Sequence, residues 1–245
     1  EPGLRRERPF RNPHHTATTR ALIGGGALPL PGEVTLSHNG VLFLDELPEF
    51  SRESLEALRQ PLEERRVCLH RLGETAVYPA SFLLICAQNP CPCGYLGDTE
   101  RHCTCRPQDL ERYRHKLSGP LMDRIDMRIF VKRVSYEDLA GHGGGQETSA
   151  VIRRRVCAAR ERQQRRFAGT GVRCNAEMDH GQVRCWCPLT SEAETLLKES
   201  FRKLSLSARG YDRILKVART LADLAGRDIL SGTDIAGAVG LRNEG

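Results

Sequence analysis

Two adjacent carboxylates, Asp45 and Glu46, directly follow the wholly apolar residues 41–44 (VLFL). This run predicts a short strand buried on both faces of a parallel sheet, with both acids at its carboxyl end. A nucleoside triphosphatase needs such a pair, because one carboxylate holds the magnesium shell while its neighbour orients the attacking water. An acidic cap on the following helix is the alternative, and the motif alone leaves both open.

A second apolar run, residues 82–87, ends in Gln88 and Asn89. Because parallel strands deliver their carboxyl ends to one edge of a sheet, Asn89 is expected near Asp45 and Glu46. Its amide could position the same water through a neutral hydrogen bond. On its own, Asn89 would be an ordinary asparagine at the end of a strand.

Two arginines are candidates for binding phosphate oxygens, since a guanidinium group pairs with them as a bidentate fork and neutralises developing charge. Arg124 lies between Asp123 and Asp126, so a salt bridge to either acid is the alternative. Arg209 lies near the start of a predicted helix, where it could reach a phosphate or simply face solvent.

One loop contains two C-x-C pairs, formed by Cys91, Cys93, Cys103 and Cys105. Four thiolates suit a closed structural zinc site, and the glycines between the pairs suit a tight turn. Four unbound reduced thiols are the alternative, and His102 is a possible substitute ligand. A second site at Cys174, Cys185 and Cys187 lacks a matching pair, so we expect core or surface thiols there.

The hydrophobic pattern predicts the helices and strands that carry these residues. Residues 51–64 predict a helix capped by Ser51, and residues 67–78 predict a β-hairpin with its tip at 71–74. Short apolar stretches between Gly, Pro and His within residues 1–40 could form another hairpin. Helices are expected at about 150–167, 191–203 and 207–225, with a last one capped by Thr233 or Asp234.

The expected fold class is therefore α/β, with a parallel sheet and a β-hairpin, followed by an all-helical domain. We assign residues 1–138 to the α/β core, 139–148 to a glycine-rich linker and 149–245 to the helical domain. The chain has 245 residues and a net charge of +6. Without an apolar run of roughly 18 residues or a signal peptide, we expect a cytoplasmic protein with no membrane partner.

The combined motifs resemble the ComM/YifB family, magnesium-chelatase-like proteins of the AAA+ class. The resemblance rests on residues 8–16 (RPFRNPHHT), 31–48 (PGEVTLSHNGVLFLDELP), 89–94 (NPCPCG), 117–126 (LSGPLMDRID) and 207–214 (SARGYDRI). It implies an AAA+ core with a hairpin before sensor 1 and a helical lid. It also implies ATP and Mg²⁺ as cofactors, a homo-hexamer, and a DNA motor that promotes branch migration during recombination of incoming DNA.

The same resemblance implies a role for each candidate residue. Asp45 and Glu46 match Walker B, Asn89 matches sensor 1, Arg124 matches a finger supplied to the neighbouring subunit, and Arg209 matches sensor 2. Residues up to about 40 match an insertion that, like the 67–78 hairpin, faces the central pore. DNA contacts are therefore expected from His14, His15 and Arg71. The basic stretches at 153–155 and 160–166 could contact phosphates too, with a solvated helix face as the alternative.

The chain departs from the family pattern because no G-x-x-x-x-G-K-[ST] motif occurs in it. In the family that loop lies upstream, so this chain looks like part of a longer polypeptide and is expected not to hydrolyse ATP alone. Two other functions stay open: a magnesium-chelatase-type ATPase for metal insertion, and a non-catalytic zinc-stabilised fragment that binds DNA or protein.

Overall fold

The computed structural model describes residues 7–26, 28–71, 74–98, 100–131, 134 and 147–243. The chain divides into two compact units, residues 1–124 and 125–245, and each is described by itself. This division falls earlier in the chain than the expected boundary near residue 138, which stays a prediction. Residues 139–146 of the expected linker lie outside the described residues.

The first unit is built on a three-stranded parallel sheet in the order β1-β4-β7. The strands are β1 (Phe10–Arg11), β4 (Val41–Leu44) and β7 (Leu83–Cys86). Along β4 and β7, Val41 is opposite Leu83 and Leu44 is opposite Cys86. The two apolar strands expected from the sequence are thereby confirmed, whereas β1 was not predicted.

Burial differs between the two faces of this sheet. Leu42 and Leu44 are fully buried in the core of the first unit, together with leucines of the helix region 52–58. Leu83 and Ile85 of β7 point to the opposite face and are 59% and 42% exposed. The prediction that the strand at 41–44 is buried on both faces is wrong for the described residues: Val41 and Phe43 are only half-buried, because neighbouring side chains alternate and the core covers one face of the sheet.

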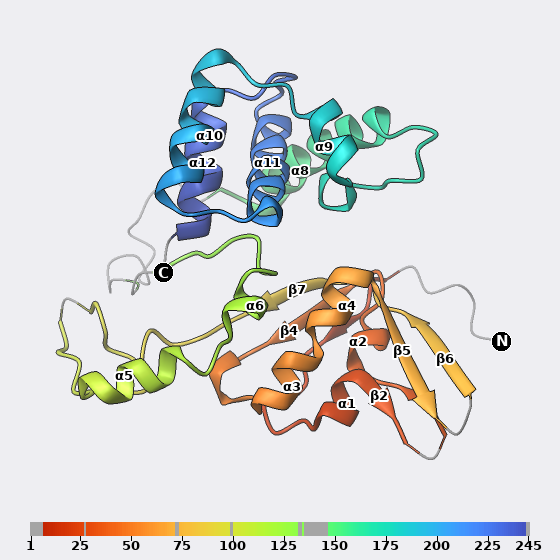
Figure 1. Cartoon of the computed structure of the whole chain (residues 1–245), viewed down its shortest axis with the longest axis vertical. Coiled ribbons are helices and arrows are strands. Elements are labelled where there is room, and N and C mark those ends of the chain that lie inside the picture. Colours follow the sequence, from red (N-terminus) through yellow and green to blue (C-terminus); the bar gives the residue numbers. More distant parts are fainter. Residues whose placement is uncertain are drawn as a thin grey trace. The chain divides into compact units, whose positions relative to one another are not determined.

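Smaller elements complete the first unit (Figure 1). They are α1 (Thr19–Ile23), β2 (Gly24–Gly25), β3 (Leu30–Pro31), α2 (Glu33–Leu36), η1 (Leu47–Glu49), α3 (Arg52–Ala57), α4 (Arg59–Glu64), β5 (Arg66–Arg71), β6 (Glu74–Pro79), α5 (Pro107–Arg114) and α6 (Gly119–Met122). β5 and β6 form the hairpin predicted at 67–78, and β2 pairs with β3 in a short antiparallel ribbon within residues 1–40.

The helix expected over 51–64 is divided in two at Leu58. Pro61 has no N–H to donate to the carbonyl of Ala57, and its ring crowds that carbonyl, so one continuous helix is disfavoured. The predicted cap is confirmed, because the Ser51 side chain accepts a hydrogen bond from the backbone N–H of Ser54.

The second unit contains α8 (Ser149–Arg166), η2 (Asn175–Glu177), α9 (His180–Trp186), α10 (Ser191–Lys203), α11 (Ala208–Leu224) and α12 (Gly232–Asn243). Three of these helices were predicted to within two residues at either end, and α9 was not predicted. The last helix begins before Thr233, and Asp234 accepts the backbone N–H of Ser231 at 2.9 Å. Within the described ranges, no helix has both the length and the apolar character that a membrane span requires.

Candidate nucleotide site and cysteine cluster

The carboxyl ends of β4 and β7 lie at the same edge of the sheet. The backbone N–H of Ala87 donates to the carbonyl of Leu44 at 2.9 Å, and that of Leu47 donates to the carbonyl of Ala87 at 3.0 Å. These bonds place the segment with Asp45 and Glu46 beside the segment that leads to Asn89. The predicted meeting of the two segments is confirmed, while the chemical roles of the side chains stay predictions.

Glu46 has an unusual backbone for a glutamate, with φ 52° and ψ 45° in the left-handed region. Its backbone N–H donates to Oδ1 of Asp45 at 2.9 Å, and both acids are exposed. Residues other than glycine hold this conformation at a cost, and such positions cluster at functional sites. Glu46 makes no side-chain cap to η1, and Ser51 caps α3, so the acidic-cap alternative is not what the structure contains.

His15, predicted to contact DNA, lies against Glu46. Its Nδ1 is 2.9 Å from Oε2 of Glu46. The His14 and His15 rings lie with centroids 4.1 Å apart and planes tilted by 35°, and the rings of His15 and Phe50 meet edge to face with centroids 6.5 Å apart. Sequence analysis missed this contact, because only the pairing of β1 with β4 brings together residues that are far apart in the chain.

The Arg124 side chain contacts residues of the first unit. Nη2 forms an ion pair with Glu63, Nε donates to the carbonyl of Arg59 at 3.1 Å, and Nη1 donates to the carbonyl of Pro120 at 2.7 Å. The side chain is 13% exposed. An ion pair was the stated alternative to a finger, but Glu63 was not the partner that the sequence suggested.

The other two predicted arginines are placed by their elements. Arg209 lies in the first turn of α11, which Ser207 caps, and so belongs to the second unit. The structure therefore does not bring Arg209 together with Asp45 and Glu46 within one unit. Arg71 is the last residue of β5, at the tip of the predicted hairpin.

Two residues that the sequence did not single out contact the segments that follow β4 and β7. The hydroxyl of Tyr113 on α5 donates to the carbonyl of Asn89 at 3.1 Å. Lys116 forms an ion pair with Glu49 at 3.0 Å. Burial and, after it, the negative charges of Glu49, Cys91 and Glu46 raise the pKa of Tyr113. Tyr113 therefore stays a neutral hydrogen-bond donor at physiological pH.

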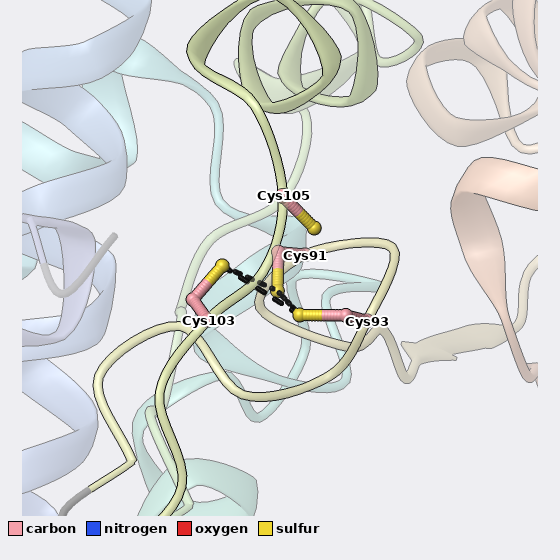
Figure 2. A group of neighbouring side chains, drawn as sticks. All are labelled: Cys91, Cys93, Cys103 and Cys105. Atoms are coloured by element: carbon pink, nitrogen blue, oxygen red, sulfur yellow. Dashed lines mark hydrogen bonds between the residues drawn. The ribbon is translucent and has the colours of Figure 1, made fainter.

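Four sulfur atoms gather in the loop between β7 and α5 (Figure 2). They belong to Cys91, Cys93, Cys103 and Cys105, and all lie within 4.8 Å of one another. The Cys91–Cys93, Cys93–Cys103 and Cys91–Cys103 sulfur distances are 3.4, 3.6 and 3.7 Å. Zinc–sulfur bonds of about 2.3 Å in a tetrahedron require sulfur atoms about 3.8 Å apart. The cluster could therefore hold a metal ion.

The backbone of this loop supports the same interpretation. Gly94 and Gly97 have φ values of 83° and 82°, which confirms the expected tight turn and explains the glycines. Backbone N–H groups of Tyr95 and Thr104 lower the pKa of Cys93 to about 5, whereas burial raises the pKa of Cys105 to about 12. One thiolate is thus favoured at neutral pH, and further thiolates need a cation to neutralise them.

The other candidate ligands stay apart from this cluster. His102 is exposed and is not a member of the four-residue group. In the part of the chain that the structure describes, Cys174, Cys185 and Cys187 belong to no group of potential metal ligands. Cys187 is buried in the core of the second unit and Cys185 is exposed, in keeping with core and surface thiols.

The parallel sheet with acids at its edge, the hairpin before β7 and the helical second unit define an α/β core of the AAA+ class with a helical lid. The chain belongs to the magnesium chelatase ChlI family: residues 1–139 match the family "Magnesium chelatase, subunit ChlI", and residues 146–242 match its C-terminal companion. The match confirms the family resemblance found in the sequence.

Curated relatives from bacteria agree with this assignment. The chain is 44% identical over 237 residues to YifB of Escherichia coli and to the competence protein ComM of Haemophilus influenzae, and 42% identical over 236 residues to YifB of Salmonella typhimurium. These alignments cover 96–97% of this chain but only 45–46% of the relatives. The chain thus spans about half the length of the curated relatives it matches.

Proposed function

We propose that this chain is the catalytic part of a hexameric ATP-driven DNA motor that promotes branch migration. The observation that supports it most is the shared edge of β4 and β7, which presents Asp45 and Glu46 beside the segment that leads to Asn89. The similarity to a competence protein favours DNA over other partners of such an ATPase.

The donor chemistry at this edge fits a magnesium-bound nucleotide, because carboxylate oxygens are the ligands that Mg²⁺ prefers. Bound Mg²⁺ would polarise the terminal phosphate of ATP. Asp45 would hold the metal shell, Glu46 would orient the attacking water and accept its proton, and Asn89 would fix that water by an amide hydrogen bond. Arg124 and Arg209 would bind phosphate oxygens, with Arg124 acting on the adjacent subunit.

We further propose that the four-cysteine cluster holds a structural Zn²⁺. The ligand set is all thiolate, as in closed zinc sites, and Cys91 is completely buried. Cys91 follows Asn89 by two positions, so an ordered cluster also fixes where β7 ends and where Asn89 lies.

ATP turnover in a longer protein, in which a phosphate-binding loop precedes this chain, tests the function. We expect turnover that DNA junctions stimulate and that Glu46→Gln abolishes while nucleotide binding persists. Stimulation by a porphyrin and its partner subunits, without any by DNA, would support the metal-insertion alternative. Absence of ATP turnover in the longer protein would support the remaining alternative, a non-catalytic zinc-stabilised fragment that binds DNA or protein.

The chain of 245 residues by itself provides a control. Without backbone amides and a lysine to cradle the phosphates, it should hydrolyse no ATP above background. Robust hydrolysis by this chain alone would contradict the assignment.

A further inference from the structure

The end of α5 contacts both segments that carry the proposed catalytic side chains. Tyr113 lies in the last turn of α5, and its hydroxyl donates to the backbone carbonyl of Asn89 at 3.1 Å. Three positions further along the chain, the ammonium group of Lys116 lies 3.0 Å from a carboxylate oxygen of Glu49 in η1. One short stretch of chain therefore contacts the segment after β7 and the segment after β4.

The hydrogen bond from Tyr113 acts on a residue whose backbone no strand holds. β7 ends at Cys86, and Asn89 lies in neither a helix nor a strand. Pro90 follows Asn89 and favours an extended backbone there, but the peptide group between them can still rotate within the extended region. Because a donor prefers the plane of the carbonyl group, the bond from Tyr113 restricts this rotation and with it the direction of the Asn89 side chain.

Tyr113 is suited to this task because its own position is restricted. It lies on a helix, and the ammonium group of Lys116 lies 5.7 Å from the centroid of its ring. A phenolic hydroxyl has a single hydrogen to donate, and Asn89 accepts it. On the other side of Asn89, Cys91 is completely buried within the cysteine cluster. The backbone around Asn89 is therefore restrained by α5 and by the cluster.

We propose that Tyr113 is a positioning residue for ATP hydrolysis, which holds the backbone of Asn89 so that the Asn89 amide meets the attacking water. This inference rests on the proposed ATPase function. Without the Tyr113 hydroxyl, Asn89 stays at the end of β7, but its amide samples directions that do not reach the water. The hydrolytic step then slows, whereas nucleotide binding, to which Asn89 contributes little, does not change.

Steady-state turnover of the longer protein tests this role. Tyr113→Phe removes only the hydroxyl and should lower kcat by roughly five- to tenfold, the factor for one neutral hydrogen bond, while KM for ATP stays the same. Asn89→Ala combined with Tyr113→Phe should be no slower than Asn89→Ala alone, because Tyr113 acts only through Asn89. Tyr95→Phe is the matched control: it removes a hydroxyl that accepts a hydrogen bond from Arg101 and should leave turnover unchanged.

Three results would overturn the proposal. The first is an unchanged kcat in Tyr113→Phe. The second is a raised KM for ATP at unchanged kcat, because the hydroxyl would then serve nucleotide binding. The third is that Tyr113→Phe lowers kcat by the same factor in the Asn89→Ala background, because Tyr113 would then act on the stability of the first unit and not through Asn89.

Carbonyl-carbon NMR of this chain gives a readout independent of turnover. Tyr113→Phe should shift the resonance of the Asn89 carbonyl carbon, whereas Tyr95→Phe should not. An unmoved resonance would show that the hydrogen bond is absent, even where the longer protein hydrolyses ATP. A shifted resonance together with no ATP turnover by the longer protein would confirm the contact but contradict the proposed function, and with it the role of Tyr113.

Discussion

Arg124 and Glu63, separated by 61 positions in the sequence, form an ion pair at the end of α4. The carbonyls of Arg59 and Pro120 accept two further hydrogen bonds from the same guanidinium group. Within a single chain Arg124 is thus held by its own unit. To act as a finger on a neighbouring subunit, Arg124 must first exchange its ion pair with Glu63 for a phosphate. A Glu63 variant therefore serves as the control for loss of this ion pair.

If Arg124 is a finger in the longer protein, Arg124→Ala should lower turnover by about 10³-fold or more, because the charge on the developing phosphate is lost. Glu63→Gln should leave turnover within a few-fold. Mixing Arg124→Ala subunits with Glu46→Gln subunits should regenerate some activity. At some interfaces the intact Glu46 of one subunit then meets the intact Arg124 of the other. Equal losses of thermal stability in Arg124→Ala and Glu63→Gln, with no activity from exchanging mixtures, would make Arg124 a structural residue only.

Zinc content tests the cysteine cluster. Reduced protein purified without chelators should carry about one zinc per chain, measured by elemental analysis, and Cys91→Ser with Cys103→Ser should abolish it. Cys185→Ser, which changes an exposed thiol outside the cluster, should retain the metal. Metal removal should loosen the loop and lower the unfolding temperature, because binding free energy at such a site is folding free energy. A zinc-free reduced protein would rule the site out.

A buried charge network in the second unit predicts a large stability effect. Asp223 is 2% exposed, accepts hydrogen bonds from Arg166 and Asn175, and lies 3.2 Å from Arg219. Asp223→Ala should lower the free energy of unfolding by about 3–5 kcal/mol, since it leaves buried guanidinium groups unpaired. Glu147→Ala, which breaks an exposed pair with Arg155, should cost less than about 1 kcal/mol.

The lowered pKa of Asp223 predicts how the stability of the protein depends on pH. Burial alone would raise the pKa of Asp223, but hydrogen bonds from Arg166 and Asn175 outweigh it, and the pKa is lowered overall. Its contribution is therefore fully present above the unfolded-state pKa of about 3.9 and is lost as pH falls through the lower folded-state value. Denaturant unfolding should show the gap between the unmodified protein and Asp223→Ala narrowing below pH 4, and a constant gap would contradict this.

Alanine substitutions at Gly40, which contacts the residue before β1, and at Gly119, which has open space beside it, test the packing of β1. A Cβ on Gly40 would lie 1.9 Å from the carbonyl oxygen of Pro9, which also accepts the N–H of Val41. Gly40→Ala should cost about 1–3 kcal/mol of unfolding free energy and displace β1. A Cβ on Gly119, in the first turn of α6, meets nothing within 4 Å, so Gly119→Ala should be neutral or slightly stabilising. Similar unfolding midpoints for the two variants would show that β1 does not pack as described.

Features that depend on residues close together in the chain could be predicted from the sequence. The apolar runs at 41–44 and 82–87 became β4 and β7, the alternation at 67–78 became a hairpin, and Ser51 capped α3. The two C-x-C pairs predicted the cysteine cluster, because ligands two positions apart in a glycine-containing loop meet without help from distant elements.

Contacts between residues far apart in the chain became visible only in the folded protein. β1 has two residues and therefore no readable period, yet its pairing with β4 is what brings His15 to Glu46. The end of α4 brings Glu63 to Arg124 in the same way. Such contacts depend on backbone hydrogen bonds and core packing between segments tens of residues apart, so no local pattern of residue types encodes them.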